Sequence, residues 1–341
     1  PFTTSTIQQE ASRKLGFSVS RTMSAAQKLY EAGLITYMRT DSVTMSDLAL
    51  DGAASFISST YGAEYSETRV YQNKSKGAQE AHEAIRPTDF AVSTYKGRVD
   101  EEKLYGLIWK RAISSQMANA RLEKTTVKID ISNSSEVFTA KGEVITFEGF
   151  LKVYLEGTDD ENEEDTKGLL AQMTQGEVMQ RDAIVATQRF TNHPPRYTEA
   201  SLVKKLEELG VGRPSTYAST INTIQKRRYV DIPEREGTLR DYSVLTLVDS
   251  TVESAVQTEN TGAERNKLAP TDIGYVVNDF LIEHFGEILD YHFTAGVEEQ
   301  FDIVSQGQQN WTDMIKDFYA PFKDTVDKTT EIANRADGER I

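Results

Sequence analysis

Residues 31–42 read EAGLITYMRTDS, and the predicted secondary structure changes from helix to extended chain within this stretch. Gly33 can end the helix that precedes it, at the C′ position that glycine favours. The run 34–40 is rich in β-branched and aromatic residues and is too short for a helix, so it predicts a strand or extended segment. Side chains two positions apart share a face there, which places Tyr37 and Arg39 on one side, about 6–7 Å apart at the backbone.

Two helices are predicted before this segment. Ser5 and Gln8 have the spacing of a capping box, and apolar residues then recur at helical spacing up to Gly16. Ser20 can cap a second helix, which ends at Gly33. Two helices joined by a short turn and followed by an extended segment are typical of a helix-turn-helix with a wing.

A similar pattern returns in the second half of the chain. Thr198 can cap a helix that Gly210 ends, and a short turn leads from there into another helix. Thr271 can cap a later helix, and residues beyond about 270 keep the helical pattern. We interpret the two halves as carrying related helix-turn-helix units.

The turn between the helices of the second unit contains the string GRPST. Pro214 suits the first turn of a helix. We expect free N–H groups around Ser215, Thr216 and Tyr217 to form an anion site beside Arg213, at the positive end of the helix. The alternative is a well-capped helix without a ligand.

Strand-like stretches broken by glycines lie between the two helical units. They cover 126–131, 137–140, 150–155 and 177–190. The sequence therefore predicts a multidomain α+β fold, in which two mainly helical domains with helix-turn-helix or winged-helix-like units are joined by an antiparallel β arch. The expected domains are 1–122, 123–190, with an acidic loop at 156–168, and 191–341.

Composition excludes several classes of protein. The formal net charge of −15 excludes a uniformly basic nucleic-acid-binding protein, and the lack of cysteine excludes disulfides, zinc-thiolate sites and cysteine nucleophiles. No stretch approaches the roughly 20 apolar residues of a membrane span. The charge is uneven, because residues 156–165 hold seven acids and no base, whereas 189–230 sum to +5 and 1–41 to +2. We expect the acidic run to be a solvated loop rather than a metal site.

Tyr37 and Arg39 are candidates for phosphate chemistry. A tyrosine phenol has a pKa near 10, so as a nucleophile it needs a cationic or proton-accepting neighbour. Arg39 can supply that charge and hold phosphate oxygens in a bidentate fork, and Asp41 can orient the arginine. The chain has 15 tyrosines, and a tyrosine in a strand more often packs or lies at the surface, so spacing alone does not assign catalysis.

Five strings together closely resemble signatures of bacterial type IA DNA topoisomerases. They are EAGLITYMRTDS at 31–42, EAHEAIRPTD at 80–89, GVGRPSTYASTINTIQKRRYV at 210–230, PTDIG at 270–274 and FTAGVEEQFD at 293–302. Met38, and Glu83 with Arg86, are more similar to the topoisomerase I branch than to the topoisomerase III branch. The resemblance covers nearly the whole chain, and its weakest part is the acidic loop.

The resemblance implies catalytic roles for three residues. Tyr37 matches the nucleophile that attacks single-stranded DNA, forming a 5′-phosphotyrosine and freeing a 3′-hydroxyl. Arg39 matches the residue that holds the scissile phosphate, and His82 matches a histidine near it. His82 read without that context is a helix-surface histidine with its polar atoms satisfied.

The resemblance also implies supporting and DNA-binding residues. We expect the DNA backbone to contact Arg39, Arg213, Ser215, Thr216 and Arg228. Arg228 belongs to a basic helix end, and the alternative for it is a solvated helix end without a ligand. Expected to support the site are Asp41, Glu80, Glu83 and Arg86, the last three through ion pairs on a local helix.

Type IA relatives also have an N-terminal Toprim domain with an acidic Mg²⁺ cluster. Because the chain begins at Pro1 just before a strong helix start, we expect it to be an excerpt of a longer protein, with Mg²⁺ bound by a Toprim domain and by no site within 1–341. We therefore predict that the polypeptide alone does not relax DNA.

The resemblance implies an ATP-independent DNA isomerase that relaxes negative supercoils by cutting one strand, passing another and resealing. Its expected partner is single-stranded or negatively supercoiled DNA, and it is expected to be a monomer at the nucleoid, in the cytoplasm and off the membrane. Two alternatives are a non-catalytic winged-helix DNA-binding regulator and a tyrosine nickase that does not reseal.

Overall fold

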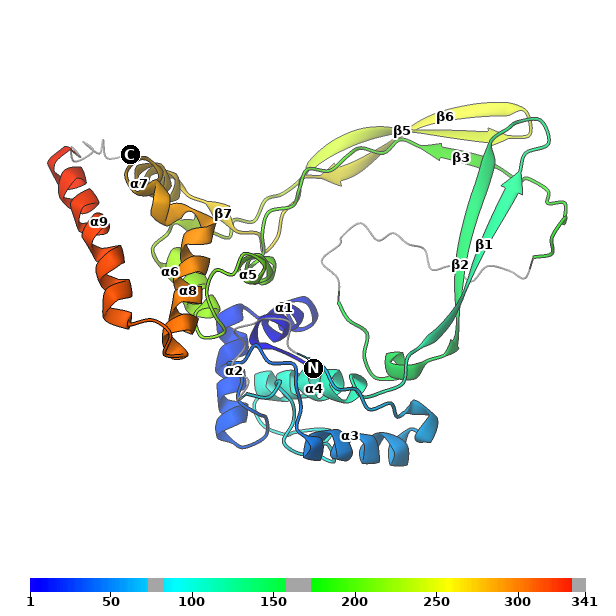
Figure 1. Ribbon diagram of the computed structural model, residues 1–341. Coiled ribbons are helices and arrows are strands. Elements are labelled where there is room, and N and C mark those ends of the chain that lie inside the picture. The colour runs from blue at the N-terminus through cyan, green and yellow to red at the C-terminus, as the bar shows by residue number, and fades with distance from the viewer. Residues whose placement is uncertain (73–81, 158–172, 333–341) are drawn as a thin grey trace.

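The structure is a computed structural model that describes residues 1–72, 82–157 and 173–332. Figure 1 shows two helical bodies and an arch of β-ribbons that extends away from them. Glu80 and most of the acidic loop predicted at 156–168 lie outside the described residues. The division into three domains remains a prediction.

The first helical body contains four α-helices and two 3-10 turns. They are α1 (Thr4–Leu15), α2 (Val19–Glu31), α3 (Asp47–Thr60), η1 (Ala63–Tyr65), α4 (Val99–Ser114) and η2 (Gly149–Lys152). One core joins them, with fully buried side chains that include Phe2, Phe17, Leu29, Tyr105 and Ile108. This core is the largest in the described part of the chain, and it supports the segment that carries Tyr37.

The first two helix caps lie two residues earlier than predicted. Thr3, not Ser5, caps α1, and its side chain and that of Thr6 accept hydrogen bonds from each other's backbone N–H groups. Ser18, not Ser20, caps α2. Thr3 and Ser18 have the extended backbone that an N-cap requires. Gly33 has φ +71, in agreement with its predicted position after α2.

The 34–40 segment forms no regular strand, so of the two forms predicted for it, a strand or an extended segment, the strand was wrong. Its contact with neighbouring chain is an isolated bridge between Ile35 and Pro87, flanked by a hydrogen bond of 3.0 Å from Thr36 N–H to the Arg86 carbonyl. Met38 and Thr40 are buried, whereas Arg39 between them is exposed. A regular ladder does not form because Thr4 takes the backbone groups of Met38 and Thr40.

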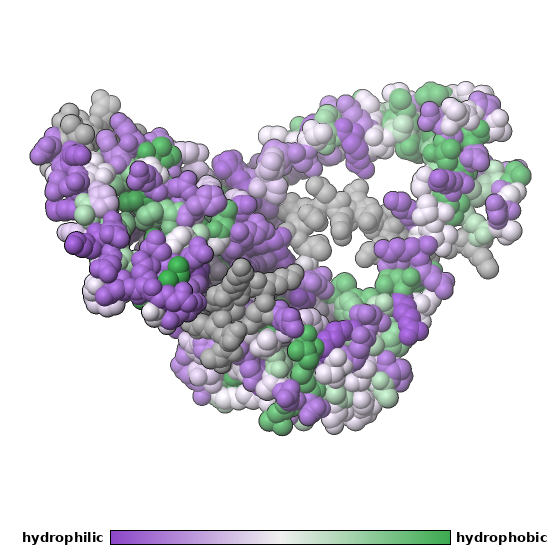
Figure 2. Space-filling model, viewed as in Figure 1, coloured by the Kyte–Doolittle hydropathy of each residue, from purple (hydrophilic) through white to green (hydrophobic). Residues whose placement is uncertain are grey.

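Two antiparallel ribbons form the arch. One pairs β1 (Arg121–Asp130) with β2 (Val137–Phe147), and the other is a sheet in the order β3-β5-β6, with β3 (Ile184–Thr187), β5 (Thr238–Val248) and β6 (Thr251–Thr261). The ribbons meet at the end of the arch away from the helices (Figure 1). Their side chains are largely exposed on both faces, and Figure 2 shows apolar surface along the arch.

Two strand predictions differed from the structure. Residues 150–155 were expected to be extended, but η2 covers the first half of them, and Tyr154 beyond it is buried in the helical core. The hairpin β5–β6 was not predicted as strands. A ribbon exposed on both faces has no buried side, so its sequence lacks the alternation that marks a half-buried strand. Its two-residue turn at Asp249 also lacks the Asn-Gly or Asp-Gly signal.

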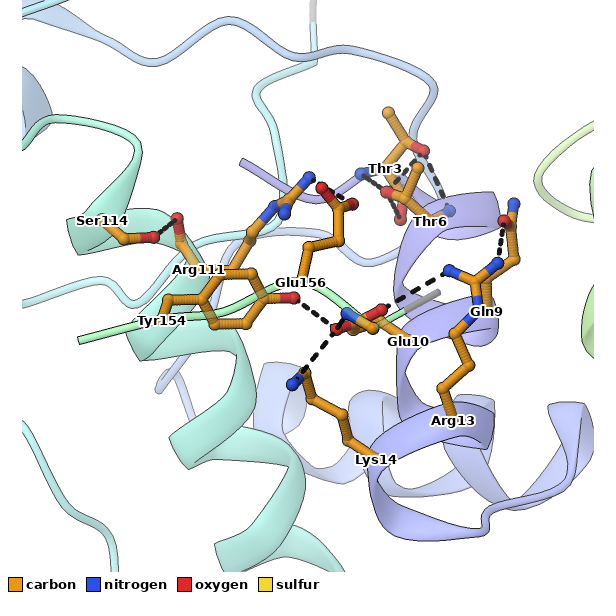
Figure 3. A network of polar contacts seen from close by, with 11 residues as sticks. Thr3, Thr6, Gln9, Glu10, Arg13, Lys14, Arg111, Ser114, Tyr154 and Glu156 are labelled. Atoms are coloured by element: carbon orange, nitrogen blue, oxygen red, sulfur yellow. Dashed lines mark hydrogen bonds and ion pairs between the residues drawn. The ribbon is translucent and has the colours of Figure 1, made fainter. Parts of the chain in front are cut away.

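A buried polar network ties the end of the first ribbon to α1 (Figure 3). The Tyr154 hydroxyl and the Gly157 N–H each donate to Glu10 Oε1 at 2.8 Å. Glu10 also forms ion pairs with Arg13 at 3.5 Å and Lys14 at 3.7 Å. Burial, and next the hydrogen bond to Glu10, raise the pKa of Tyr154 well above its ordinary value. The phenol therefore stays protonated and keeps this bond.

The second helical body contains five helices and a short β pair. They are α5 (Glu199–Glu208), α6 (Tyr217–Lys226), β4 (Val230–Asp231), β7 (Ala269–Pro270), α7 (Asp272–Leu289), α8 (Tyr291–Ser305) and α9 (Trp311–Ile332). Thr198 and Thr271 cap α5 and α7 as predicted. A Cβ atom at Gly274 would overlap the Tyr229 carbonyl, so glycine is needed where α7 begins.

The two bodies are in direct contact through their helix-turn-helix units. Val19, at the start of α2, packs in one buried cluster with Val203, Tyr217 and Ile221 of α5 and α6. The Val19 N–H donates to Glu199 Oε2 at 2.8 Å. Ser5 Oγ donates to Glu207 Oε2 at 2.6 Å. This interface brings the Tyr37 segment and the GRPST turn to the same place.

Candidate active site

A pocket of about 380 Å³ lies where the two bodies meet. Its residues come from four separate parts of the described chain. They are Tyr37, Arg39, Thr40 and Asp41 after α2, His82, and Arg213, Pro214, Ser215, Glu298 and Asp302 from the second body. Four of the strings quoted above therefore supply side chains to one pocket.

Tyr37 is half-buried against two other rings. Its ring centroid lies 5.3 Å from that of Tyr30 and 5.5 Å from that of His82, both in edge-on contacts. These contacts fix the position of the ring, as aromatic pairs in this geometry do. Within the described residues no hydrogen bond from the Tyr37 hydroxyl is found. Tyr37 and Arg39 both line the pocket.

The backbone around Arg39 is held from α1. Thr4 is fully buried, and its Oγ1 lies 2.7 Å from the Met38 carbonyl oxygen and 2.8 Å from the Thr40 nitrogen. The Thr4 N–H donates in turn to the Thr40 carbonyl at 2.8 Å. Arg39 is thus fixed at the backbone on both sides, while its side chain stays exposed at the pocket. Asp41 is half-buried and lines the same pocket.

His82 lies beside Tyr37, but not on a helix. Residues 82–84 have no regular structure, so the expectation of a local helix with helical ion pairs was wrong for this described part. The buried Nδ1 of His82 has no hydrogen-bond partner among the described residues. The alternative of a helix-surface histidine with its polar atoms satisfied is therefore not what the structure shows. A buried, unpaired ring nitrogen in a polar pocket is suited to receive a ligand.

Glu83 and Arg86 form the predicted ion pair without the helix. Arg86 Nε donates to Glu83 Oε2 at 2.6 Å, and the Ser46 N–H donates to the same oxygen at 3.2 Å. Burial opposes the charged form of Glu83, but the bonds to Arg86 and Ser46 outweigh it and lower the pKa of this carboxyl. This pair joins the His82 segment to the start of α3.

The GRPST turn contributes Arg213, Pro214 and Ser215 to the pocket. Arg213 and Ser215 line it, whereas Thr216 does not, because its Oγ1 accepts from the Arg213 N–H at 2.8 Å. The predicted anion site at free N–H groups was largely wrong. The N–H groups of Thr216 and Tyr217 both donate to the Arg213 carbonyl, at 2.8 and 3.3 Å. The helix begins at Tyr217, so Pro214 lies in the preceding turn.

Arg228 lies away from the pocket. It follows α6 at the end opposite to Ser215, and ten helical residues span about 15 Å. Its φ of +58 places it in the left-handed region that ends a helix, and its carbonyl accepts from Thr271 Oγ1 at 2.5 Å. Arg228 is exposed and remains a candidate for DNA contact beyond the pocket.

Sequence reasoning missed two acidic residues of the pocket. Glu298 and Asp302 lie four positions apart on α8, and both approach Arg213. They belong to the string FTAGVEEQFD, in which the i,i+4 spacing of acids was the available signal. With Asp41, they bring three carboxylates into a pocket that holds two arginines.

The pocket combines a tyrosine, two arginines and a histidine. This set can bind a phosphodiester and attack its phosphorus, because arginines hold the non-bridging oxygens and stabilise charge in the transition state. Across 1–72, 82–157 and 173–332, no group of three or more His, Asp or Glu side chains has the geometry to hold a metal ion. These described residues thus do not fit a Mg²⁺ site, and the Mg²⁺ implied by the resemblance was expected in a Toprim domain.

Comparison with known proteins assigns the family. A family model described as DNA topoisomerase matches residues 1–261. The chain belongs to the DNA topoisomerase family. The resemblance to type IA topoisomerases is thereby confirmed, and so is the mixed α+β fold with antiparallel sheets.

Individual relatives match along nearly all of the topoisomerase chain. It is 44% identical to DNA topoisomerase 1 type prokaryotic from Acanthamoeba polyphaga mimivirus, over 97% of this chain and 41% of that protein. It is 43% identical to DNA topoisomerase 1 from Xylella fastidiosa, over 100% of this chain and 40% of that protein. The structure of full-length topoisomerase I from Thermotoga maritima superposes with a TM-score of 0.71 at 32% identity, over 95% of this chain and 49% of that one.

The topoisomerase chain spans about two fifths of the length of these curated relatives. In its described part, no helix is both long and apolar enough to cross a lipid bilayer.

Proposed function

We propose that this chain carries the strand-cutting pocket and the strand gate of a type IA topoisomerase, an ATP-independent isomerase that relaxes negatively supercoiled DNA. One observation supports this most strongly. Tyr37, Arg39, His82 and Arg213 are far apart in the sequence, yet they line one pocket at the interface of the two helical bodies.

In the proposed reaction, the Tyr37 hydroxyl oxygen attacks the phosphorus of a phosphodiester in single-stranded DNA. A bond from tyrosine to phosphorus forms, the bond from phosphorus to the 3′ oxygen breaks, and the phenolic proton balances the 3′-hydroxyl that leaves. Arg39 and Arg213 hold the non-bridging oxygens, and His82 donates or accepts a hydrogen bond beside them. Resealing is the reverse reaction, so one phosphoester replaces another and no ATP is needed.

The contact of α1 and α2 with the α5–α6 pair lies next to the pocket and includes one buried cluster of four side chains. We assign it to the gate that separates while the cut strand is held. Separation of the bodies, with the arch as the connection, would open a path for a second strand. The substrate places this activity at the nucleoid, in the cytoplasm, and one chain contains the whole pocket, as a monomer would require.

We propose that the whole topoisomerase uses Mg²⁺, bound by a Toprim domain, and that the residues of this pocket act without a metal ion of their own. We propose that residues 1–341 alone do not relax DNA, and that relaxation requires a Toprim domain. The winged-helix regulator is not adopted, because the chain belongs to the topoisomerase family and the 34–40 segment is not a wing strand.

Covalent trapping tests the proposal. The chain is joined to the Toprim domain of a relative and incubated with single-stranded DNA carrying a label 3′ to the cleavage site, then denatured. We expect a labelled protein adduct through the 5′ phosphate, which Tyr37→Phe abolishes and Tyr30→Phe retains. An adduct that survives Tyr37→Phe, or DNA cut without resealing, would contradict the proposal.

A further inference from the structure

Arg213 is held on three sides within the pocket. Its Nη2 lies 3.3 Å from Asp302 Oδ2, its Nε lies 3.6 Å from Glu298 Oε2, and its Nη1 donates to the Gly212 carbonyl at 3.2 Å. Each guanidinium nitrogen therefore faces an oxygen of the protein. The Nε–Nη2 edge, which is one of the two edges that bind phosphate in a fork, faces carboxylates.

The carboxylates hold this edge loosely. Charge-assisted N–H···O bonds are typically about 2.7–2.9 Å long, and both contacts here are longer. The side chains of Glu298 and Asp302 are 22% and 36% exposed, and that of Arg213 is 34% exposed. Pairs so long and so accessible to water exchange readily for another anion, in contrast to the 2.6 Å bond of Arg86 to Glu83.

The charge of the pocket opposes an incoming phosphate. Asp41, Glu298 and Asp302 face Arg39 and Arg213, so carboxylates outnumber guanidinium groups. A phosphodiester would add one more negative charge to this set. The phosphodiester can bind the Nε–Nη2 edge of Arg213 only if the two α8 carboxylates release this edge.

We propose that Glu298 and Asp302 form a carboxylate lock on Arg213, which occupies the phosphate-binding edge in the DNA-free protein and is exchanged for a DNA phosphate when a strand enters. The lock lowers the affinity for a strand whose phosphate binds Arg213, because the two ion pairs must first be broken. It rests on the proposed function only in that the pocket receives a DNA phosphate, and it does not depend on cleavage at Tyr37.

An equilibrium binding measurement tests the lock. A fluorescein-labelled oligothymidylate is titrated with the 341-residue chain, and its anisotropy is followed at low salt. We expect the double variant Glu298→Gln/Asp302→Asn to bind roughly three- to tenfold more tightly than the wild type, as two partly exposed ion pairs allow. The control is Glu299→Gln/Asp279→Asn, which removes two exposed acids of the same body that do not contact Arg213.

The gain must depend on Arg213. In an Arg213→Gln background the double variant should bind no more tightly than Arg213→Gln alone. A loss of affinity in the double variant would overturn the lock and show that the carboxylates position the guanidinium for DNA. An equal gain in affinity in the control variant would show that the loss of negative charge alone causes the effect, and this result would also overturn the lock.

Two further outcomes also decide the matter. If neither the wild type nor the double variant binds the oligonucleotide, the pocket does not take phosphate in this way and the lock is wrong. If the double variant fails to fold, as its circular dichroism melt would show, Asp302→Asn alone makes the same test, because it removes the shorter contact. Failure of adduct formation at Tyr37, with the binding gain intact, would contradict the proposed function but not the lock.

Discussion

Thr4 Oγ1 lies 2.7 Å from the carbonyl oxygen of Met38, which joins the first turn of α1 to the segment that carries Tyr37 and Arg39. The same Oγ1 accepts the Thr40 N–H at 2.8 Å. A single buried hydroxyl thus replaces the neighbouring strand that would otherwise satisfy this backbone. The position of the pocket residues after α2 depends on a helix that lies more than thirty residues earlier in the sequence.

Thr4→Val should destabilise the first body by about 1–3 kcal/mol, because it leaves the buried Thr40 N–H without its acceptor. Valine has nearly the shape of threonine, so the loss reports the hydroxyl rather than a cavity. Thr4→Ser keeps the hydroxyl and is the matched control. Urea unfolding followed by circular dichroism measures both. Equal stability of the valine and serine variants would show that water or a shifted backbone replaces the bond.

Tyr154→Phe should lower the free energy of unfolding by about 1–3 kcal/mol, because the buried Glu10 carboxylate loses a hydrogen bond of 2.8 Å. Tyr319→Phe is the control, because Tyr319 is 55% exposed on α9. The same urea titration measures the two variants. If Tyr154→Phe matched Tyr319→Phe, the network would not anchor the ribbon to α1.

Glu199→Ala should loosen the contact between the two bodies. Glu199 accepts the Val19 N–H at 2.8 Å, at the positive end of α2, and a carboxylate there contributes about 0.3–1 kcal/mol. The Val19 amide should then exchange its hydrogen faster, as seen by mass spectrometry of peptides that cover the start of α2. Glu208→Ala, an exposed acid of the same helix, should leave that exchange unchanged. Unaltered hydrogen exchange at Val19 in Glu199→Ala would show that Glu199 does not hold the gate closed.

The sequence was sufficient to predict several helix ends, because their signals are local. Thr198 and Thr271 each cap a helix, and Gly33 and Gly210 follow one with positive φ, because capping depends on a few neighbouring residues. The resemblance likewise named Tyr37, Arg39, His82 and Arg213, which the structure brings to one pocket.

Long-range contacts explain what the sequence did not predict. The 34–40 segment resembles a strand in composition, yet Thr4 satisfies its backbone, and no local pattern records that partner. The N–H groups of Thr216 and Tyr217 turn inward to the Arg213 carbonyl, so the expected anion site is largely closed. Glu298 and Asp302 reach Arg213 from more than eighty residues away, and their role required the fold to be known.

The stability of the first body should depend on pH through Glu83. Burial raises the pKa of this carboxyl, but the bonds to Arg86 and Ser46 outweigh it, so the folded-state pKa lies below the ordinary 4.5. The unfolded chain therefore binds the proton more readily. The stabilisation is fully present above pH 4.5 and is lost as the pH falls through the folded-state pKa. Urea unfolding of wild type and Glu83→Gln between pH 7 and pH 3 should show a wild-type advantage that shrinks below 4.5.

Arg86→Gln provides the matched test of this cause. Without Arg86, burial is no longer outweighed to the same extent, so replacing Glu83 in that background should change stability less at pH 7 and with little dependence on pH. The double-mutant cycle over Glu83 and Arg86 gives their coupling free energy directly. A coupling that stayed constant from pH 7 to pH 3 would mean that the charge of Glu83 is not what the arginine stabilises. The 2.6 Å contact between Arg86 and Glu83 would then not stabilise the His82 segment through charge.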